Sequence, residues 1–185
     1  MKLSILQYGD PMLRAKGKRV DKIDNHIRAL AADMLEAMHA ANGIGLAAQQ
    51  IGEAIQLTVL DVSQVEDRPS TMKLNGQEVD PKTAMPLVLL NPQIELNGEK
   101  ERGIEGCLSF PEITAEIERS IAVKAQAETL EGAPIEIEAT GLLARALQHE
   151  VDHLNGILFI DRMSAATKAA LASRLKRLQK ENKRA

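Results

Sequence analysis

The chain has 185 residues, a formal net charge of −3, 44% hydrophobic and 26% charged residues, and one cysteine. This length predicts a single domain over residues 1–185 with a core large enough to fold alone, and the small net charge gives no general attraction to nucleic acid. One cysteine excludes an intrachain disulfide, and without a long apolar stretch we expect no signal peptide, no membrane segment and a cytoplasmic location.

A helix that runs to about His39 is the first element that the pattern predicts. Its apolar side chains recur at helical spacing, and Asp24 is the expected N-cap. The apolar positions are Ile23, Ile27, Leu30, Met34 and Met38. We expect these methionines to pack in the core.

The helix is followed by a glycine-rich segment with the sequence Gly43-Ile44-Gly45-Leu46-Ala47-Ala48-Gln49-Gln50. It is not a phosphate loop, because no Gly-Lys-Ser/Thr ending is present. We interpret Gly43 as a helix C-cap that leads into a turn. The small residues permit a close backbone approach, and a glutamine amide here could donate a hydrogen bond to an oxyanion.

The middle of the chain has the pattern of strands. Residues 55–62 are rich in β-formers, and further strands are predicted over residues 87–96, 112–118, 121–128 and 134–139. Residues 63–86 are polar and contain Asn75-Gly76 and three prolines, which predicts either a hairpin insert around Asn75-Gly76 or a mobile loop. Because helices and strands segregate, we predict an α+β fold, with antiparallel sheets packed around a central metal-binding helix and with N- and C-terminal helices.

The one cysteine, Cys107, lies in the sequence Glu105-Gly106-Cys107-Leu108-Ser109-Phe110-Pro111. Taken alone, a free cysteine is more often a small buried hydrophobe than a ligand. Its thiolate would nevertheless bind a borderline metal well, and Gly106 permits close backbone approach to a ligand. Cys107 alone therefore leaves both interpretations open.

The most informative segment is His149-Glu150-Val151-Asp152-His153. On a helix, residues i and i+4 share one face, so both imidazoles can reach one metal ion, and Glu150 is then held where a general base would act. Residues 140–148 are good helix formers, Leu142 and Ala146 continue the histidine face, and Asn155-Gly156 is a helix stop. The alternative is a buried helix whose histidines are only hydrogen-bonded.

Two histidines leave a catalytic metal site one protein ligand short. No histidine follows His153, and the only downstream carboxylates, Asp161 and Glu181, belong to no obvious ligand motif. We therefore expect the third ligand to come from upstream. With Cys107, the two imidazoles would make a three-ligand set with an open position for water or substrate.

Three segments together resemble peptide deformylases. The family's Gly-x-Gly-Leu-Ala-Ala-x-Gln motif is matched by residues 43–50, its Glu-Gly-Cys-Leu-Ser motif by residues 105–109, and its Gln-His-Glu-x-Asp-His motif by residues 148–153. Residues 5–14 also resemble the family's N-terminus, so the likeness spans nearly the whole chain in order. Three motifs in order are highly specific, whereas one alone would not be.

The resemblance implies a role for each matched residue. The metal ligands would be Cys107, His149 and His153, and Glu150 would be the general acid/base. The oxyanion would be stabilised by Gln50 and the backbone N–H of Leu108. The substrate peptide would lie along Ile44, Gly45, Glu105 and Gly106, and its methionine side chain would lie against Leu142, Ala146 and His149.

The resemblance also implies a bacterial-type, iron-dependent hydrolase. It would remove the N-formyl group from the N-terminal formyl-methionine of newly synthesised polypeptides and release formate, so its partners would be N-formylmethionyl nascent peptides. One divalent metal per chain is expected, with Fe2+ as the natural ion and Zn2+, Ni2+ or Co2+ able to substitute. The donor set alone does not select iron, because Cys-His-His suits zinc at least as well.

Two features depart from the family pattern. Residues 64–86 lengthen the connection before residues 87–92, where many relatives turn more tightly. Thr114 stands where some bacterial members carry an arginine near the substrate, which puts a basic contact to the peptide there in doubt. Neither feature touches the predicted catalytic residues.

Residues 164–185 are predicted to form a basic C-terminal helix. The packing positions are Ala169, Leu171, Leu175 and Leu178, and the basic residues are Lys168, Arg174, Lys176, Arg177, Lys180, Lys183 and Arg184. We favour a solvated helix end, where cations interact well with the helix dipole. The alternative is docking on the ribosome, since some bacterial deformylases use a basic C-terminal helix near the nascent-chain exit.

Two other functions could use the same residues. A metallopeptidase shares the His-Glu-x-x-His helix, but Cys107 as the third ligand argues against it. A non-catalytic metal-binding or peptide-binding module would be expected to lack Glu150 or Cys107, and both are present.

Overall fold

A computed structural model describes residues 2–183 and confirms the α+β class. In this part of the chain a single seven-stranded antiparallel sheet, in the order β1-β2-β5-β6-β7-β3-β4, takes the place of the separate sheets that we expected. The strands are β1 (Gly45–Ala47), β2 (Leu57–Leu60), β3 (Ser70–Leu74), β4 (Gln77–Val79), β5 (Leu87–Cys107), β6 (Phe110–Glu128) and β7 (Pro134–Thr140). The α-helices are α1 (Asn25–Ala40), α2 (Pro81–Ala84), α3 (Gly141–Leu154) and α4 (Ala165–Asn182), and the 3-10 helices are η1 (Pro11–Arg14), η2 (Ala48–Ile51) and η3 (Phe159–Arg162).

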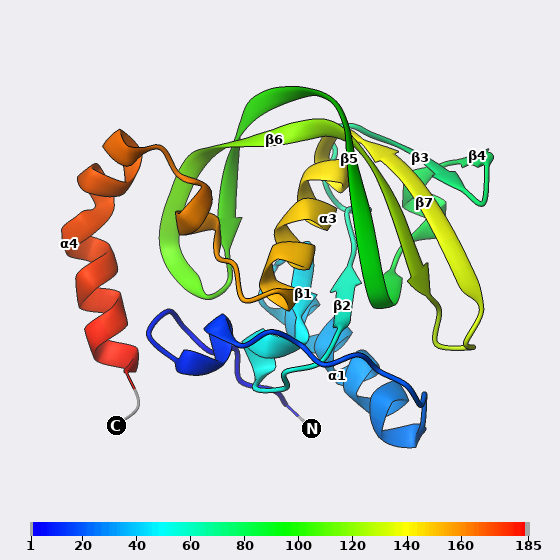
Figure 1. The fold of residues 1–185 in the computed structure, drawn as a ribbon, viewed down its shortest axis with the longest axis horizontal. Coiled ribbons are helices and arrows are strands. Elements are labelled where there is room, and N and C mark those ends of the chain that lie inside the picture. The colour runs from blue at the N-terminus through cyan, green and yellow to red at the C-terminus, as the bar shows by residue number, and fades with distance from the viewer. Residues whose placement is uncertain (1, 184–185) are drawn as a thin grey trace.

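Helix α3 lies at the centre of the fold, and the curved sheet passes around it (Figure 1). It contacts β1, β2, β3, β5, β6 and β7. Of its 14 residues, 12 are buried, which is the pattern of a core helix rather than of a surface helix. The predicted stop at Asn155-Gly156 is confirmed, with Asn155 as C-cap and Gly156 at φ +73°. The helix that carries both histidines is therefore shielded on nearly every side.

The two longest strands, β5 and β6, pair along most of their length and arch over α3 (Figure 1). The sequence pattern predicted three shorter strands here and missed residues 97–107. Most side chains of residues 95–103 are exposed, so no apolar alternation marks this stretch. Register shifts near Leu90, Asn97 and Gly106 bend the pair, as β-bulges do.

Helix α1 confirms the predicted N-cap, because the Asp24 side chain accepts a hydrogen bond from the Ile27 N–H at 3.0 Å. Its C-terminus differs from the prediction. Asn42, at φ +55°, is the left-handed residue, while the Gly43 N–H donates to the Met38 carbonyl at 2.9 Å. Gly43 is needed for space instead, since an added Cβ would lie 2.6 Å from Leu108 Cδ1.

The long connection between β2 and β5 contains the hairpin that Asn75-Gly76 predicted. Asn75 at φ +49° and Gly76 at φ +85° turn the chain between β3 and β4. Strand β3 also pairs with β7, so the hairpin extends the sheet. Residues 70–79 are thus an ordered part of the fold rather than a mobile loop.

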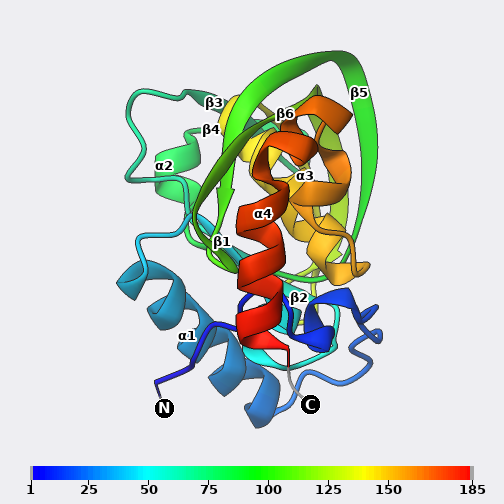
Figure 2. The ribbon, with the colours of Figure 1, turned by 90° about the vertical axis from the view of Figure 1, so that its left-hand side faces the viewer.

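Helix α4 packs along one side of the molecule (Figure 2). Leu175 is buried, and Leu171 and Leu178 pack beside it with Tyr8 and Phe110, whereas Ala169 is exposed and does not have the packing role that we expected. Arg184 lies outside the described residues. Within residues 2–183, no helix is both long and apolar enough to cross a membrane.

Gly141 begins α3 at φ +67°, and an added Cβ would lie against the carbonyl oxygen of Pro69. Gly76 has a similar φ of +85° but open space around it. We expect Gly76→Ala to lower the free energy of unfolding by about 1 kcal/mol through backbone strain, and Gly141→Ala to cost about 2 kcal/mol more because of the steric clash. Urea unfolding of both variants measures this difference, and equal losses would contradict it.

Candidate active site

The three predicted metal ligands converge on one point. Cys107 stands at the end of β5, and its Sγ lies 3.4 Å from His153 Nε2. The Nε2 atoms of His149 and His153, one helical turn apart on α3, are 3.1 Å from each other. All three donor atoms lie within 4.8 Å of one another. One thiolate and two imidazole nitrogens that face a common point fit a divalent ion with an open coordination position.

The pKa values of the two imidazoles are shifted in opposite directions. Burial would lower the pKa of His149, but hydrogen bonds with Cys107 and Glu105 raise it well above its ordinary value. Burial and the neighbouring His149 lower the pKa of His153 well below its ordinary value. The two rings are too close for both to hold a proton, so His153 stays neutral beside His149 and keeps a nitrogen lone pair available.

Glu105 orients the His149 ring through a hydrogen bond on the side of the ring away from the predicted metal position. Its Oε1 accepts a hydrogen bond from His149 Nδ1 at 2.9 Å, which directs Nε2 toward the metal position. Arg119 donates two further hydrogen bonds at 2.9 Å, and Arg145 donates one at 2.9 Å. Burial alone would raise the pKa of Glu105, but the hydrogen bonds from His149 and Arg119 lower it to about 2. Glu105 lines the predicted substrate cleft, yet its carboxylate is fully engaged by these three partners.

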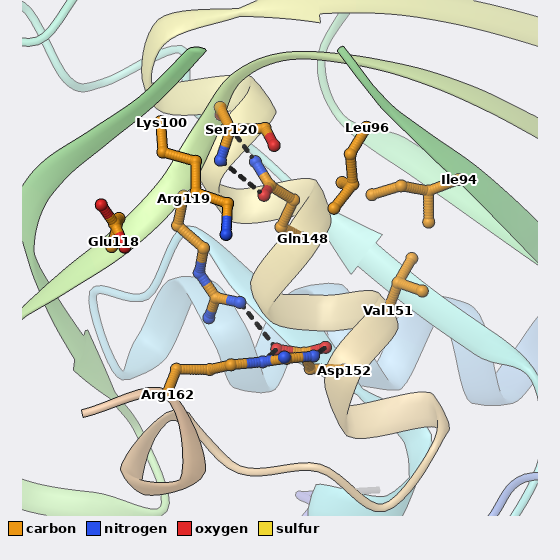
Figure 3. Close-up of a pocket in the computed structure, with 10 residues that line it drawn as sticks. All are labelled: Ile94, Leu96, Lys100, Glu118, Arg119, Ser120, Gln148, Val151, Asp152 and Arg162. Atoms are coloured by element: carbon orange, nitrogen blue, oxygen red, sulfur yellow. Dashed lines mark hydrogen bonds and ion pairs between the residues drawn. The ribbon is translucent and has the colours of Figure 1, made fainter. Parts of the chain in front are cut away.

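The other side of α3 is held by a second set of polar contacts (Figure 3). Asp152 accepts from Arg119 at 2.6 Å and from Arg162 at 2.9 Å and 3.1 Å. The Gln148 side chain exchanges two hydrogen bonds with the backbone of Ser120, at 2.9 Å and 3.0 Å. These contacts hold α3 against β6 and η3, and they therefore help to set the orientation of the two histidine side chains.

Glu150 lies buried in the wall of the cleft that the site residues line. Its side chain is buried, and within the described residues no group hydrogen-bonds to its Oε2. Burial raises the pKa of Glu150 to about 7. Gly45 makes room for the carboxylate, since an added Cβ would lie against Glu150 Oε1. A carboxyl group with such a pKa can both accept and donate a proton near neutral pH.

Gln50 reaches the same point from the glycine-rich segment. Its Oε1 accepts from the Ala47 N–H at 2.9 Å, and its Nε2 donates to Ser109 Oγ at 3.1 Å and lies 3.7 Å from Cys107 Sγ. Because the carbonyl side of the amide is held by Ala47, the N–H side must face the cysteine. A preorganised donor thus lies beside the predicted metal position.

The predicted site residues share one cavity of about 440 Å³. Every one of them lines it except His153, which is buried beneath Cys107 and His149. Thr114 lines the same cavity. Sequence reasoning missed Arg119 and Ser109, which hold Glu105 and Gln50, and it missed Arg68, which also lines the cavity. Ser109 belongs to the Glu-Gly-Cys-Leu-Ser motif, which is the signal that could have marked it. No local signal marks Arg119 or Arg68, because strand register and chain path alone bring them to their positions.

This fold and site define the class of metal-dependent hydrolases, with a cysteine and a His-Glu-x-x-His helix placed so that they could hold a metal ion. The family model of polypeptide deformylases matches residues 2–169. The chain is 43% identical to a peptide deformylase of Opitutus terrae over 182 residues, covering 97% of this chain and 94% of that protein. It is 41% identical to that of Acinetobacter baumannii over 183 residues, covering 98% of this chain and 94% of that protein.

Solved structures agree with the sequence relatives. Peptide deformylase 1B of Arabidopsis thaliana superposes with a TM-score of 0.84 at 37% identity, covering 97% of this chain and 91% of that chain. Peptide deformylase of Thermotoga maritima superposes with a TM-score of 0.76 at 39% identity, covering 89% of this chain and 99% of that chain. The chain belongs to the peptide deformylase family, as its three motifs predicted.

Arg119 is buried between Glu105 and Asp152, so Arg119→Met would leave two buried carboxylates short of a partner. We expect this variant to lose about 3–5 kcal/mol of unfolding free energy. Arg162→Met is the matched control, because Arg162 donates to the same Asp152 but its side chain is 45% exposed; it should lose less than about 1 kcal/mol. Urea unfolding tests both, and similar losses would show that Arg119 does not bridge the two carboxylates.

Proposed function

We propose that this protein removes the formyl group from the N-terminal formyl-methionine of newly synthesised polypeptides and releases formate. The observation that carries the proposal is the convergence of Cys107, His149 and His153 beside the buried Glu150 and the Gln50 amide. A metal that activates water, a general base and an oxyanion donor together supply the groups with which a metallohydrolase cleaves an amide.

We propose Cys107, His149 and His153 as the ligands of one divalent metal, with Fe2+ as the natural ion. When bound, the metal would act as a Lewis acid and lower the pKa of a coordinated water toward about 7. The soft thiolate and the two imidazoles suit iron, zinc, nickel or cobalt, so metal availability decides the occupant. Glu105 supports the set by holding the His149 ring in one tautomer.

The remaining residues would move protons and stabilise charge. Glu150 accepts the proton of the attacking water and later gives it to the leaving amine, for which its raised pKa is suited. The Gln50 amide and the Leu108 backbone N–H donate to the formyl oxygen as it becomes negative. Each such donor is worth about 3 kcal/mol in other oxyanion holes.

The substrate would lie in the 440 Å³ cavity, along Ile44 and Gly45 on one wall and Glu105 and Gly106 on the other. The methionine side chain would pack against the apolar face of α3, formed by Leu142, Ala146 and the His149 ring. This face is buried and preformed, which favours an unbranched apolar side chain.

We further propose a ribosome contact for the basic face of α4, as the alternative to a purely solvated helix end. The basic side chains between Lys168 and Lys183 are exposed, while α4 packs on the rest of the protein through Leu175. Such a face would favour a polyanionic partner. Because Leu175 is part of the core, removal of the helix would disturb the fold, so charge substitutions give the cleaner test.

Formate release from formyl-Met-Ala by protein prepared anaerobically with iron tests the reaction. We expect Glu150→Gln to retain metal and to lose activity by at least about 10²-fold, because it cannot accept the water proton. Glu112→Gln changes an exposed carboxylate of the same cavity and should retain activity. Full activity in Glu150→Gln would refute the assigned base, and cleavage of an internal peptide bond without formate release would indicate a metallopeptidase instead.

Ribosome binding is tested with the triple variant Lys176→Gln, Arg177→Gln, Lys180→Gln, compared with Lys16→Gln, Lys22→Gln, Lys73→Gln. Both sets remove three exposed cations. We expect only the α4 variant to lose co-sedimentation with ribosomes at low salt, since each lost phosphate contact weakens binding and its salt dependence. Equal co-sedimentation of both variants would leave α4 as a solvated helix end.

A further inference from the structure

The catalytic cleft continues into a second cavity of about 490 Å³. Four residues line both spaces: Arg68, Ile104, Leu142 and Arg145. Leu142 belongs to the proposed methionine pocket, so the junction lies at the edge of that pocket. Ile104 is 55% exposed there, although it is a large apolar side chain. A peptide seated in the cleft would therefore pass close to these residues.

Arg68 differs from the other charged residues that line this cleft. Glu105 and Arg145 neutralise each other through a 2.9 Å ion pair, and Glu150 is buried as the proposed base. Glu112 is exposed, and its carbonyl accepts a hydrogen bond from Arg174. Within residues 2–183, Arg68 makes no ion pair or side-chain hydrogen bond, although it is half-buried. A half-buried guanidinium without a partner is the group most ready to bind an incoming carboxylate.

The position of Arg68 is set by the neighbouring Pro69, which hydrogen-bonds to the start of α3. It lies in the connection between β2 and β3, directly before Pro69, whose carbonyl accepts from the Leu142 N–H at 3.2 Å. The start of α3 thus holds this segment in place at the edge of the methionine pocket. Thr114, on another wall of the same cavity, is uncharged and offers no competing cation.

We propose that Arg68 is a specificity-determining residue that binds a carboxylate side chain in the two residues that follow the formyl-methionine. This inference rests on the proposed function, because it takes the peptide to lie in the catalytic cleft. The protein would then process acidic N-termini faster than basic ones. The interaction is made equally in the ground state and the transition state, so it changes KM more than kcat.

The test uses C-terminally amidated peptides, formyl-Met-X-Ala and formyl-Met-Ala-X, with Glu, Gln or Lys at X. For the wild-type protein we expect kcat/KM to be about fivefold higher for Glu than for Gln at one of the two positions, and lowest for Lys. The preference should fall at high salt, because the pair is partly exposed. Arg68→Gln should abolish the preference, Arg68→Lys should retain part of it, and Arg68→Glu should reverse it.

Arg102→Gln is the matched control, since Arg102 is exposed and lines the second cavity but not the catalytic cleft. Its charge preference should equal that of the wild-type protein. The same peptides are titrated into Glu150→Gln by calorimetry, so that Kd reports the preference without turnover. Charge-dependent Kd values without formate release by the wild type would overturn the proposed function alone. Equal kcat/KM and equal Kd for Glu, Gln and Lys peptides would overturn the role of Arg68.

Discussion

The buried carboxylate of Glu105 is the interaction on which the site depends. A buried carboxylate is strongly unfavourable unless charged and hydrogen-bonding partners surround it. Here the partners come from different elements: Arg119 from β6, and Arg145 and His149 from α3, while Glu105 itself is on β5. The fold therefore reaches its stable state only when these three elements meet. The same contact fixes the tautomer of His149, so one charge cluster serves both the packing of α3 and the metal site.

The long β5–β6 pair explains how a ligand from a strand reaches a helix that lies far away in sequence. The two strands arch over α3, and their connection of two residues returns the chain immediately after Cys107. The cysteine is thus presented at the end of a strand, against the turn of α3 that carries His149 and His153. Because β6 is also tied to α3 through Arg119 and Ser120, the sulfur has little freedom to move away from the imidazoles.

Chemistry and recognition use largely different parts of the chain, and only α3 and the end of β5 contribute to both. The groups proposed to carry out hydrolysis are buried on α3 and η2 or half-buried at the end of β5. The groups proposed to contact the peptide lie at the start of β1, near the end of β5, in the connection after β2 and on the apolar face of α3. This division has a physical basis. Proton transfer and metal binding need a rigid, dry environment, whereas a peptide chain must enter from solvent along surfaces that tolerate variation.

By itself, the sequence determined the family and predicted the helix that carries both histidines and the three candidate metal ligands, because each depends on spacing within a short segment or on motifs in order. The helical period placed His149 and His153 on one face, and Asn75-Gly76 predicted its hairpin through local backbone preference. Only the tertiary structure decided that the strands form one sheet, that residues 97–107 belong to it, and that Arg119 and Arg68 reach the site. Strand register and the approach of a connecting segment depend on contacts between residues distant in sequence, and those contacts leave no periodic signal in the chain.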